Sequence, residues 1–96
     1  MKIDFNKTNE TMFVAIEGRL DAITAPDFES FIDENYDGAC PLILDCKDLA
    51  YVSSAGLRVL LGAQKKAKGA MKLTNVCELV IEVFEMTGFD DIFTVE

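Results

Sequence analysis

The order of hydrophobic and polar positions predicts a β-hairpin at the start of the chain. Apolar and polar residues alternate over 2–6, and 11–17 is rich in residues that favour strands. The polar stretch 7–10 between them has the composition of a turn. We therefore predict two antiparallel strands, the second of which ends at Gly18.

A helical pattern follows the loop 20–23. Thr24 is a residue type that caps helices, and Pro26 stands in the first turn, where its missing N–H costs nothing. Beyond them, apolar residues recur at helical spacing and form one face, which comprises Phe28, Phe31 and Ile32. The helix is predicted to end at 36–38.

The middle of the chain has the clearest pattern. The apolar run Leu42-Ile43-Leu44, preceded by a proline, is too short for a helix and predicts a buried strand at 42–46. A short polar loop leads to two adjacent serines, after which leucines recur at helical spacing. This pattern predicts a helix that starts at the serines, runs to about Lys68 and is ended by Gly69.

The last third predicts a strand at 71–76, a helix at 77–87 that ends at Gly88, and a final strand at 92–95. The predicted inner side of this helix comprises Leu79, Val80, Val83 and Phe84. The element order is therefore β-β-α-β-α-β-α-β. Strands that alternate with helices are expected to be parallel, and the initial hairpin makes the sheet mixed. We predict a single α/β domain over residues 1–96, with helices packed on a mixed sheet.

Composition narrows the classes of partner. The net charge of −8 argues against direct binding to nucleic acid, because phosphates attract a basic surface. No apolar run approaches the roughly 20 residues that span a bilayer, and the N-terminus has no signal-peptide core. We expect no membrane insertion and a cytoplasmic location. The three cysteines lack close-paired spacing and are expected to be reduced core residues.

Motifs for catalysis are missing from the sequence. The chain has no histidine, which excludes a Ser-His pair and a histidine metal site. Neither the P-loop nor the dinucleotide-binding glycine pattern occurs, and the serines lack the G-x-S-x-G frame. Asp45 and Asp48 come nearest to a magnesium site, but two carboxylates without a phosphate ligand are too few. We therefore expect no metal, no cofactor and no enzymatic activity.

Ser53 and Ser54 are the candidate functional residues. A strand, a short loop and a serine at a helix start direct a hydroxyl outward beside the positive end of the helix. The residues alone leave two interpretations open: a capping hydroxyl beside a polar loop residue, or a phosphate acceptor. Helical spacing places Leu61 on the outer side near Arg58, with Leu57 at the border. This predicts a small exposed apolar contact with basic edges.

Three segments give the chain a family resemblance. The stretch LILDCKDLAYVSSAGLRVLL at 42–61 resembles the signature of the STAS domain, in particular that of bacterial anti-sigma factor antagonists. The segments EGRLDAITAP at 17–26 and VFEMTGFDDI at 83–92 are similar to further parts of that family. They occupy matching places along nearly the whole chain. The STAS fold has the same succession of strands and helices that the pattern predicts.

The resemblance implies which serine is phosphorylated. In anti-sigma factor antagonists the acceptor lies two residues before a Gly-Leu pair, which implies Ser54 here. Ser53 occupies the place of a common aspartate, so it stays an alternative acceptor. Asp21 is implied to lie near this loop and to contact the kinase. The residues implied to bind the partner are Asp21, Ser53, Ser54, Gly56, Leu57, Arg58 and Leu61.

The resemblance also implies a regulatory function. An unphosphorylated antagonist binds an anti-sigma factor that is also an ATP-dependent serine kinase, and so releases a sigma factor. Phosphorylation would abolish this binding, and a serine phosphatase would restore it. Two alternatives stay open: a STAS interaction module of another signalling or transport assembly, and a small-ligand or nucleotide-binding STAS domain. One fold serves all three, so the fold does not decide between them.

Overall fold

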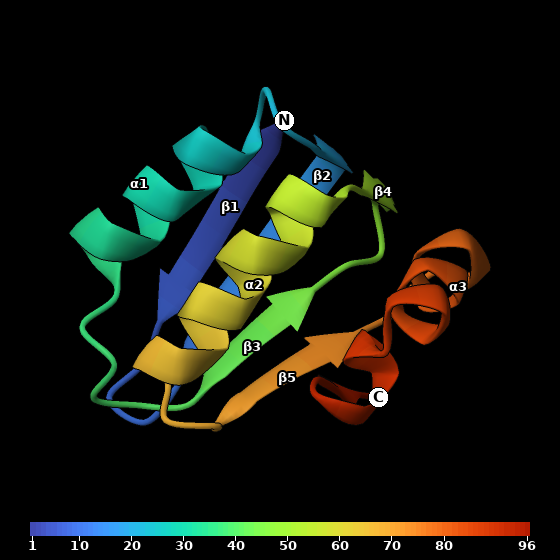
Figure 1. Ribbon diagram of the computed structural model, residues 1–96. Helices are drawn as coiled ribbons and strands as arrows, with labels where there is room; N and C mark the ends of the chain where they lie inside the picture. Colours follow the sequence, from blue (N-terminus) through green and yellow to red (C-terminus); the bar gives the residue numbers. More distant parts are fainter.

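The computed structural model describes residues 1–96 and shows a six-stranded sheet with three helices (Figure 1). The strands are β1 Lys2–Lys7, β2 Met12–Leu20, β3 Leu42–Asp45, β4 Leu49–Val52, β5 Met71–Thr74 and β6 Thr94–Val95. The helices are α1 Ala25–Asn35, α2 Ser54–Lys66 and α3 Glu78–Thr87, followed by the 3-10 turn η1 Phe89–Asp91.

The sheet is mixed, as the sequence predicts. Its strand order is β1-β2-β3-β5-β6, and β4 pairs with the far end of β2. The hairpin pairs β1 with β2 in antiparallel register from Lys2 opposite Glu17 to Lys7 opposite Met12. The remaining pairs along this order, β2 with β3, β3 with β5 and β5 with β6, are parallel. The predicted α/β fold is therefore confirmed.

The sequence prediction was wrong at the second half of β2. Gly18 does not end this strand: the register shifts between Gly18 and Arg19, and β2 continues to Leu20. Gly18 has a φ of +105°, a backbone conformation that residues with a side chain rarely adopt. Glycine adopts it readily and so permits this irregularity.

The extension of β2 pairs in parallel with β4, which lies where a polar loop was predicted. β4 is only four residues long, and its two buried residues are Leu49 and Val52, so it shows no strand period. Because β4 leads directly to Ser53, this short strand fixes where α2 begins.

The helices α1 and α2 lie side by side on one face of the sheet (Figure 1). Alternate residues of β2 are buried against them, and these are Met12, Val14 and Ile16. They share one core with Phe28 of α1 and Leu60 of α2. The period-2 pattern of the strands and the 3.6-residue pattern of the helices thus meet in a single apolar layer.

α3 lies apart from α1 and α2 and packs beside β4 and η1 (Figure 1). Val80 and Phe84 bring it into the core, and Gly88 ends it with a φ of +79°, as predicted. Leu79 was predicted to face inward, but it is 51% exposed. It lies one position before Val80, which places it about a quarter turn from the buried side.

Candidate functional site

The two serines have different positions at the start of α2. Ser53 is the N-cap residue: its backbone is extended, and its Oγ accepts a 3.4 Å hydrogen bond from the Gly56 N–H. The Ser53 N–H donates to the Leu20 carbonyl oxygen at 2.9 Å, which ties the start of α2 to the end of β2. Ser54 is the first residue of the helix and is exposed. The cap is therefore supplied by Ser53, and the Ser54 hydroxyl stays accessible.

The surroundings of Ser54 favour negative charge. The first turn of α2 contains no acidic residue, and its free backbone N–H groups carry partial positive charge. Arg58, which is exposed, follows one turn after Ser54. An anion at Ser54 would therefore gain about 0.3–1 kcal/mol from the end of the helix.

Gly56 and Leu57 do not belong to the exposed surface, which corrects the sequence prediction. A Cβ atom on Gly56 would lie 2.5 Å from the Leu20 carbonyl oxygen and 3.0 Å from Cγ1 of Val52. Leu57 is 3% exposed and belongs to the core. Both residues hold the first turn of α2 against β2 and β4. They position Ser54 but offer no surface to a partner.

Leu61 is half-buried and packs against the core, whereas the sequence prediction placed it on the outer side. The C-terminal segment of the chain comes close to this side of α2. Nε2 of Gln64, one turn further along α2, donates to the Ile92 carbonyl oxygen at 2.8 Å. That segment therefore lies against this side of α2, and a helical wheel of α2 alone cannot show it. The exposed row of α2 instead contains Ser54, Arg58, Gly62 and Lys65.

Asp21 lies in the loop between β2 and α1, directly after Leu20, whose carbonyl oxygen accepts the hydrogen bond from the Ser53 N–H. Its Oδ1 accepts hydrogen bonds from the N–H groups of Ile23 at 3.0 Å and Thr24 at 3.1 Å. In return, the Asp21 N–H donates to Thr24 Oγ1 at 3.0 Å. The bond from the Thr24 amide is the largest cause that lowers the pKa of the Asp21 carboxyl below 3.8. Asp21 therefore orders this loop, and Thr24 makes no side-chain cap of α1.

The sequence pattern gave no sign of two further residues, Arg19 and Tyr51. The Arg19 guanidinium lies 4.5 Å from the ring centre of Tyr51, and Arg19 Nε is 3.6 Å from Oδ2 of Asp21. Arg19 and Tyr51 are paired across β2 and β4. Their contact exists only because β2 extends past Gly18 and β4 forms, and neither feature was predicted.

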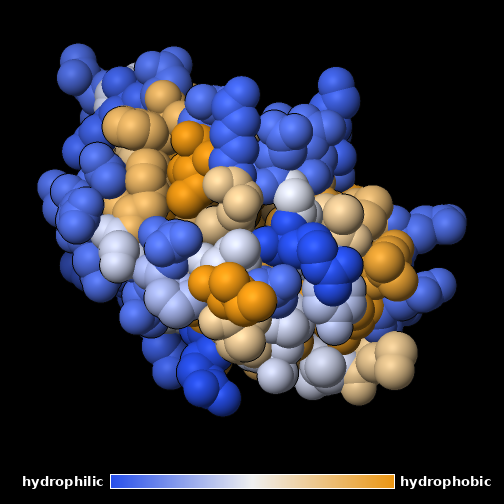
Figure 2. All heavy atoms as spheres, turned by 90° about the horizontal axis from the view of Figure 1, so that it is seen from above, coloured by the Kyte–Doolittle hydropathy of each residue, from blue (hydrophilic) through white to orange (hydrophobic).

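Seen from above, hydrophobic groups are separated by hydrophilic ones (Figure 2). Orange and tan groups gather at the upper left, in the centre and at the right of this view. Recognition on this face of the molecule would therefore combine polar groups with apolar area.

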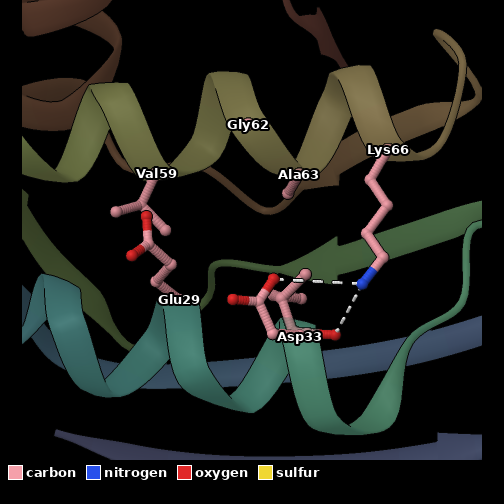
Figure 3. Close-up of a pocket in the computed structure, with 7 residues that line it drawn as sticks. Glu29, Asp33, Val59, Gly62, Ala63 and Lys66 are labelled. Carbon is pink, nitrogen blue, oxygen red and sulfur yellow. Dashed lines mark hydrogen bonds and ion pairs between the residues drawn. The ribbon is translucent and has the colours of Figure 1, made fainter.

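A groove of about 150 Å³ lies between α1 and α2, from Val59 onward and so beyond the first turn of α2. Glu29 and Asp33 of α1 face α2 across it (Figure 3). Lys66 Nζ lies 3.9 Å from Asp33 Oδ1 and 3.4 Å from the Ile32 carbonyl oxygen. Because its one cation is already engaged and two carboxylates stand beside it, this groove is a poor match for a phosphate-bearing ligand.

Asp45, the last residue of β3, and Asp48 do not belong to a cluster that could hold a metal ion. Asp45 Oδ1 accepts from the Lys47 N–H at 3.0 Å and from Asn75 Nδ2 at 3.1 Å. No group of three or more His, Cys, Asp or Glu side chains is placed to hold an ion. No helix has both the length and the apolar character needed to cross a bilayer.

Comparison with known proteins adds a family and several relatives. Residues 2–96 match the family model of the STAS domain. An anti-sigma-B factor antagonist of Bacillus subtilis (strain 168) is 30% identical over 98 residues, which span 99% of this chain and 90% of that protein. BtrV of Bordetella bronchiseptica, a candidate anti-sigma factor antagonist, is 34% identical over 99 residues, which span 99% of this chain and 85% of that protein.

A solved structure has the same fold. It is the anti-sigma factor antagonist SpoIIAA in its unphosphorylated form, with a TM-score of 0.79 and 21% identity over 99% of this chain and 88% of that one. Bacillus SpoIIAA in its phosphorylated form matches with a TM-score of 0.71 at the same 21% identity, over 99% of this chain and 91% of that one. The likeness in three dimensions therefore extends over the whole chain.

Proposed function

The chain belongs to the STAS domain family, and we propose that it is an anti-sigma factor antagonist whose binding is controlled by phosphorylation of Ser54. Unphosphorylated, it binds an anti-sigma factor that is also a serine kinase, and a sigma factor is thereby released. A serine phosphatase reverses the modification. The names of the relatives from Bacillus subtilis and Bordetella bronchiseptica support the antagonist part of this proposal. Residues 1–96 act as one domain in the cytoplasm, where ATP is available to the kinase.

The observation that carries the choice of Ser54 is the division of roles between the two serines. Ser53 Oγ accepts the capping hydrogen bond, whereas Ser54 stands exposed at the first helical position. A kinase can reach the Ser54 hydroxyl without breaking the cap. Ser53 is half-buried and its Oγ is engaged in the cap, so it is less accessible to a kinase than Ser54.

The switch follows from electrostatics at an interface. A phosphate adds a charge of about −1.5 to −2, which the N-terminus of α2 tolerates. A partner docked over Ser54 does not tolerate it, since an unpaired charge buried at an interface costs several kcal/mol. The modification therefore changes binding without refolding the domain.

The partner surface in this proposal is the exposed row of α2 together with the neighbouring loop. Ser54 and Arg58 are its centre, the exposed part of Leu61 borders it, and Asp21 lies in the adjacent loop. α2 contains basic residues and no acidic one, although the whole chain has a net charge of −8. The surface therefore suits a partner patch that is acidic.

The test is affinity capture from a lysate of the host, with the wild type and three variants side by side. We expect the wild type, Ser54→Ala and Ser53→Ala to retain a kinase-fold anti-sigma factor, and Ser54→Asp to lose it. Phosphopeptide mass spectrometry after reaction with the captured kinase should find one phosphate, at Ser54. Ser53 as the sole modified residue would contradict the assignment. Capture of a transport or signalling assembly without a kinase would favour the alternative of a STAS module in that assembly.

Folding has to be measured in the same variants. Ser54→Asp should leave the free energy of unfolding within about 1 kcal/mol of the wild type, because an acid suits a helix N-terminus. Ser53→Ala should cost about 0.5–1 kcal/mol, since it removes the cap. A large loss of stability in Ser54→Asp would show that the variant acts on folding and not on recognition.

A further inference from the structure

α3 has a second row of apolar residues that the domain covers only in part. Val80 and Phe84 face the core and are buried. Leu79, Val83 and Met86 form another row at helical spacing, in which Leu79 is 51% exposed, Met86 is 86% exposed and Val83 is half-buried. One apolar face is enough to pack a helix on a domain, so internal packing does not account for Leu79 and Met86.

Acidic residues adjoin this row. Glu78, Glu82 and Glu85 are exposed on the neighbouring side of α3, and Asp90 and Asp91 follow in η1. After Lys72 the chain contains no further lysine or arginine. The charged residues of this segment are therefore all acidic, and its helix α3 lies apart from α1 and α2 (Figure 1).

We propose that the α3 surface, formed by Leu79, Val83 and Met86 with Glu78, Glu82 and Glu85, binds an amphipathic helix of a partner that carries lysine or arginine beside its apolar residues. The apolar row has the i, i+4, i+7 spacing of surfaces that meet another helix, and methionine adapts to such contacts. The glutamates attract basic residues at the edge of the contact and exclude acidic partners.

The negative charge of the α3 surface also favours a basic helix over two other possible partners. A second copy of the chain, docked through the same surface, would bring a second row of glutamates with no lysine or arginine on α3 to pair with them. An anionic lipid surface is repelled for the same reason. The surface acts independently of Ser54, since α2 and α3 carry opposite charge and lie on different parts of the domain.

The test uses the full chain and a synthetic helical peptide of 18 residues, with leucines at helical spacing and lysines on either side. Its control is the same peptide with glutamate at every lysine position. We expect the lysine peptide to bind in calorimetry at physiological salt, with amide shifts in 15N spectra concentrated in α3, and the glutamate peptide not to bind. No binding of the lysine peptide, or shifts concentrated elsewhere, would overturn the proposal.

Matched variants separate the α3 surface from general attraction to an acidic protein. Met86→Lys should weaken binding about tenfold, as for an apolar anchor of an interface. Ile23→Lys, at a residue that is 85% exposed in the loop before α1, makes the same change of charge and should leave the affinity unchanged. The double change Glu82→Gln and Glu85→Gln should weaken binding about threefold and reduce its dependence on salt.

The equivalent double change on α1, Glu29→Gln and Glu34→Gln, should have no effect. Equal losses in the variants of α1 and α3 would show only non-specific attraction and would refute the proposal. Sedimentation of the chain alone adds a separate check. A dimer that Met86→Lys dissolves would assign the α3 surface to a second copy instead of a basic partner.

Discussion

Gly56 and Gly62 lie in the same helix but in opposite surroundings. A Cβ atom on Gly56 would lie 2.5 Å from the Leu20 carbonyl oxygen, whereas one on Gly62 would meet nothing within 4 Å. Gly56→Ala should therefore lower the free energy of unfolding by about 1–3 kcal/mol through overpacking, although alanine favours helices. Gly62→Ala should raise it by about 0.5–1 kcal/mol. Urea denaturation measures both, and equal effects of the two changes would show that the first turn of α2 can move away from β2.

Asp21 should make stability depend on pH in the acidic range. Its hydrogen bonds hold the folded pKa below the ordinary value of 3.8. A lowered pKa gives stability that is present above the ordinary value and is lost as the pH falls through the folded value. The difference in Tm between the wild type and Asp21→Asn should thus be largest near neutral pH and shrink below about pH 4. A difference that stays constant over this range would mean that the Asp21 charge adds nothing to the loop.

At the scale of single residues, the sequence predicted where α2 begins but not which of the two serines caps it. Either serine is a residue type that can cap a helix. The backbone conformation decides which serine is the cap. Ser53 is extended, with φ −93° and ψ 178°, whereas Ser54 is already helical. The burial of Gly56 was likewise unpredicted, since it depends on Leu20 from a distant strand.

At the scale of elements, α2 is held between the sheet and the C-terminal segment, and neighbouring leucines should show this. Leu60 is fully buried, whereas Leu61 is half-buried. Leu60→Lys should prevent folding or cost more than about 3 kcal/mol, because it buries a charge without a partner. Leu61→Lys should cost about 1 kcal/mol, since the lysine can extend to solvent. Chemical denaturation gives both values, and a silent Leu61→Lys would place Leu61 outside the core.

The elements themselves were predictable where a period is long enough to read. The hairpin, the three helices and the buried strand β3 follow from period and from end signals such as Gly88. β4 and the extension of β2 were not predictable, because each stabilises the other by pairing across the sheet. β4 has four residues, of which two are buried, and this is too short to show a strand period in the sequence. The contact of Arg19 with Tyr51 was not predicted either, because it depends on this pairing.

At the scale of the whole molecule, burial in the single core should determine which of the three cysteines react with a thiol reagent. Burial, the largest cause, raises the pKa of the Cys46 thiol to about 12, and Cys46 is 1% exposed. Cys40 and Cys77 are half-buried. A maleimide at neutral pH should therefore add to Cys40 and Cys77 in the folded protein and to Cys46 only in denaturant. Intact-mass spectrometry counts the adducts, and Cys46→Ala should show the same count in both conditions. Rapid labelling of folded Cys46 would mean that the core opens locally.

The two ends of the sheet have a consequence for aggregation. An unpaired edge strand is a template on which another chain can add a strand, and this is how fibrils grow. At one edge, β1 is polar at most of its positions, with a lysine at each end. At the other, β6 has only two residues. A charged edge and a very short one both resist such growth. The domain should therefore remain monodisperse when it is concentrated, even though half of its residues are hydrophobic.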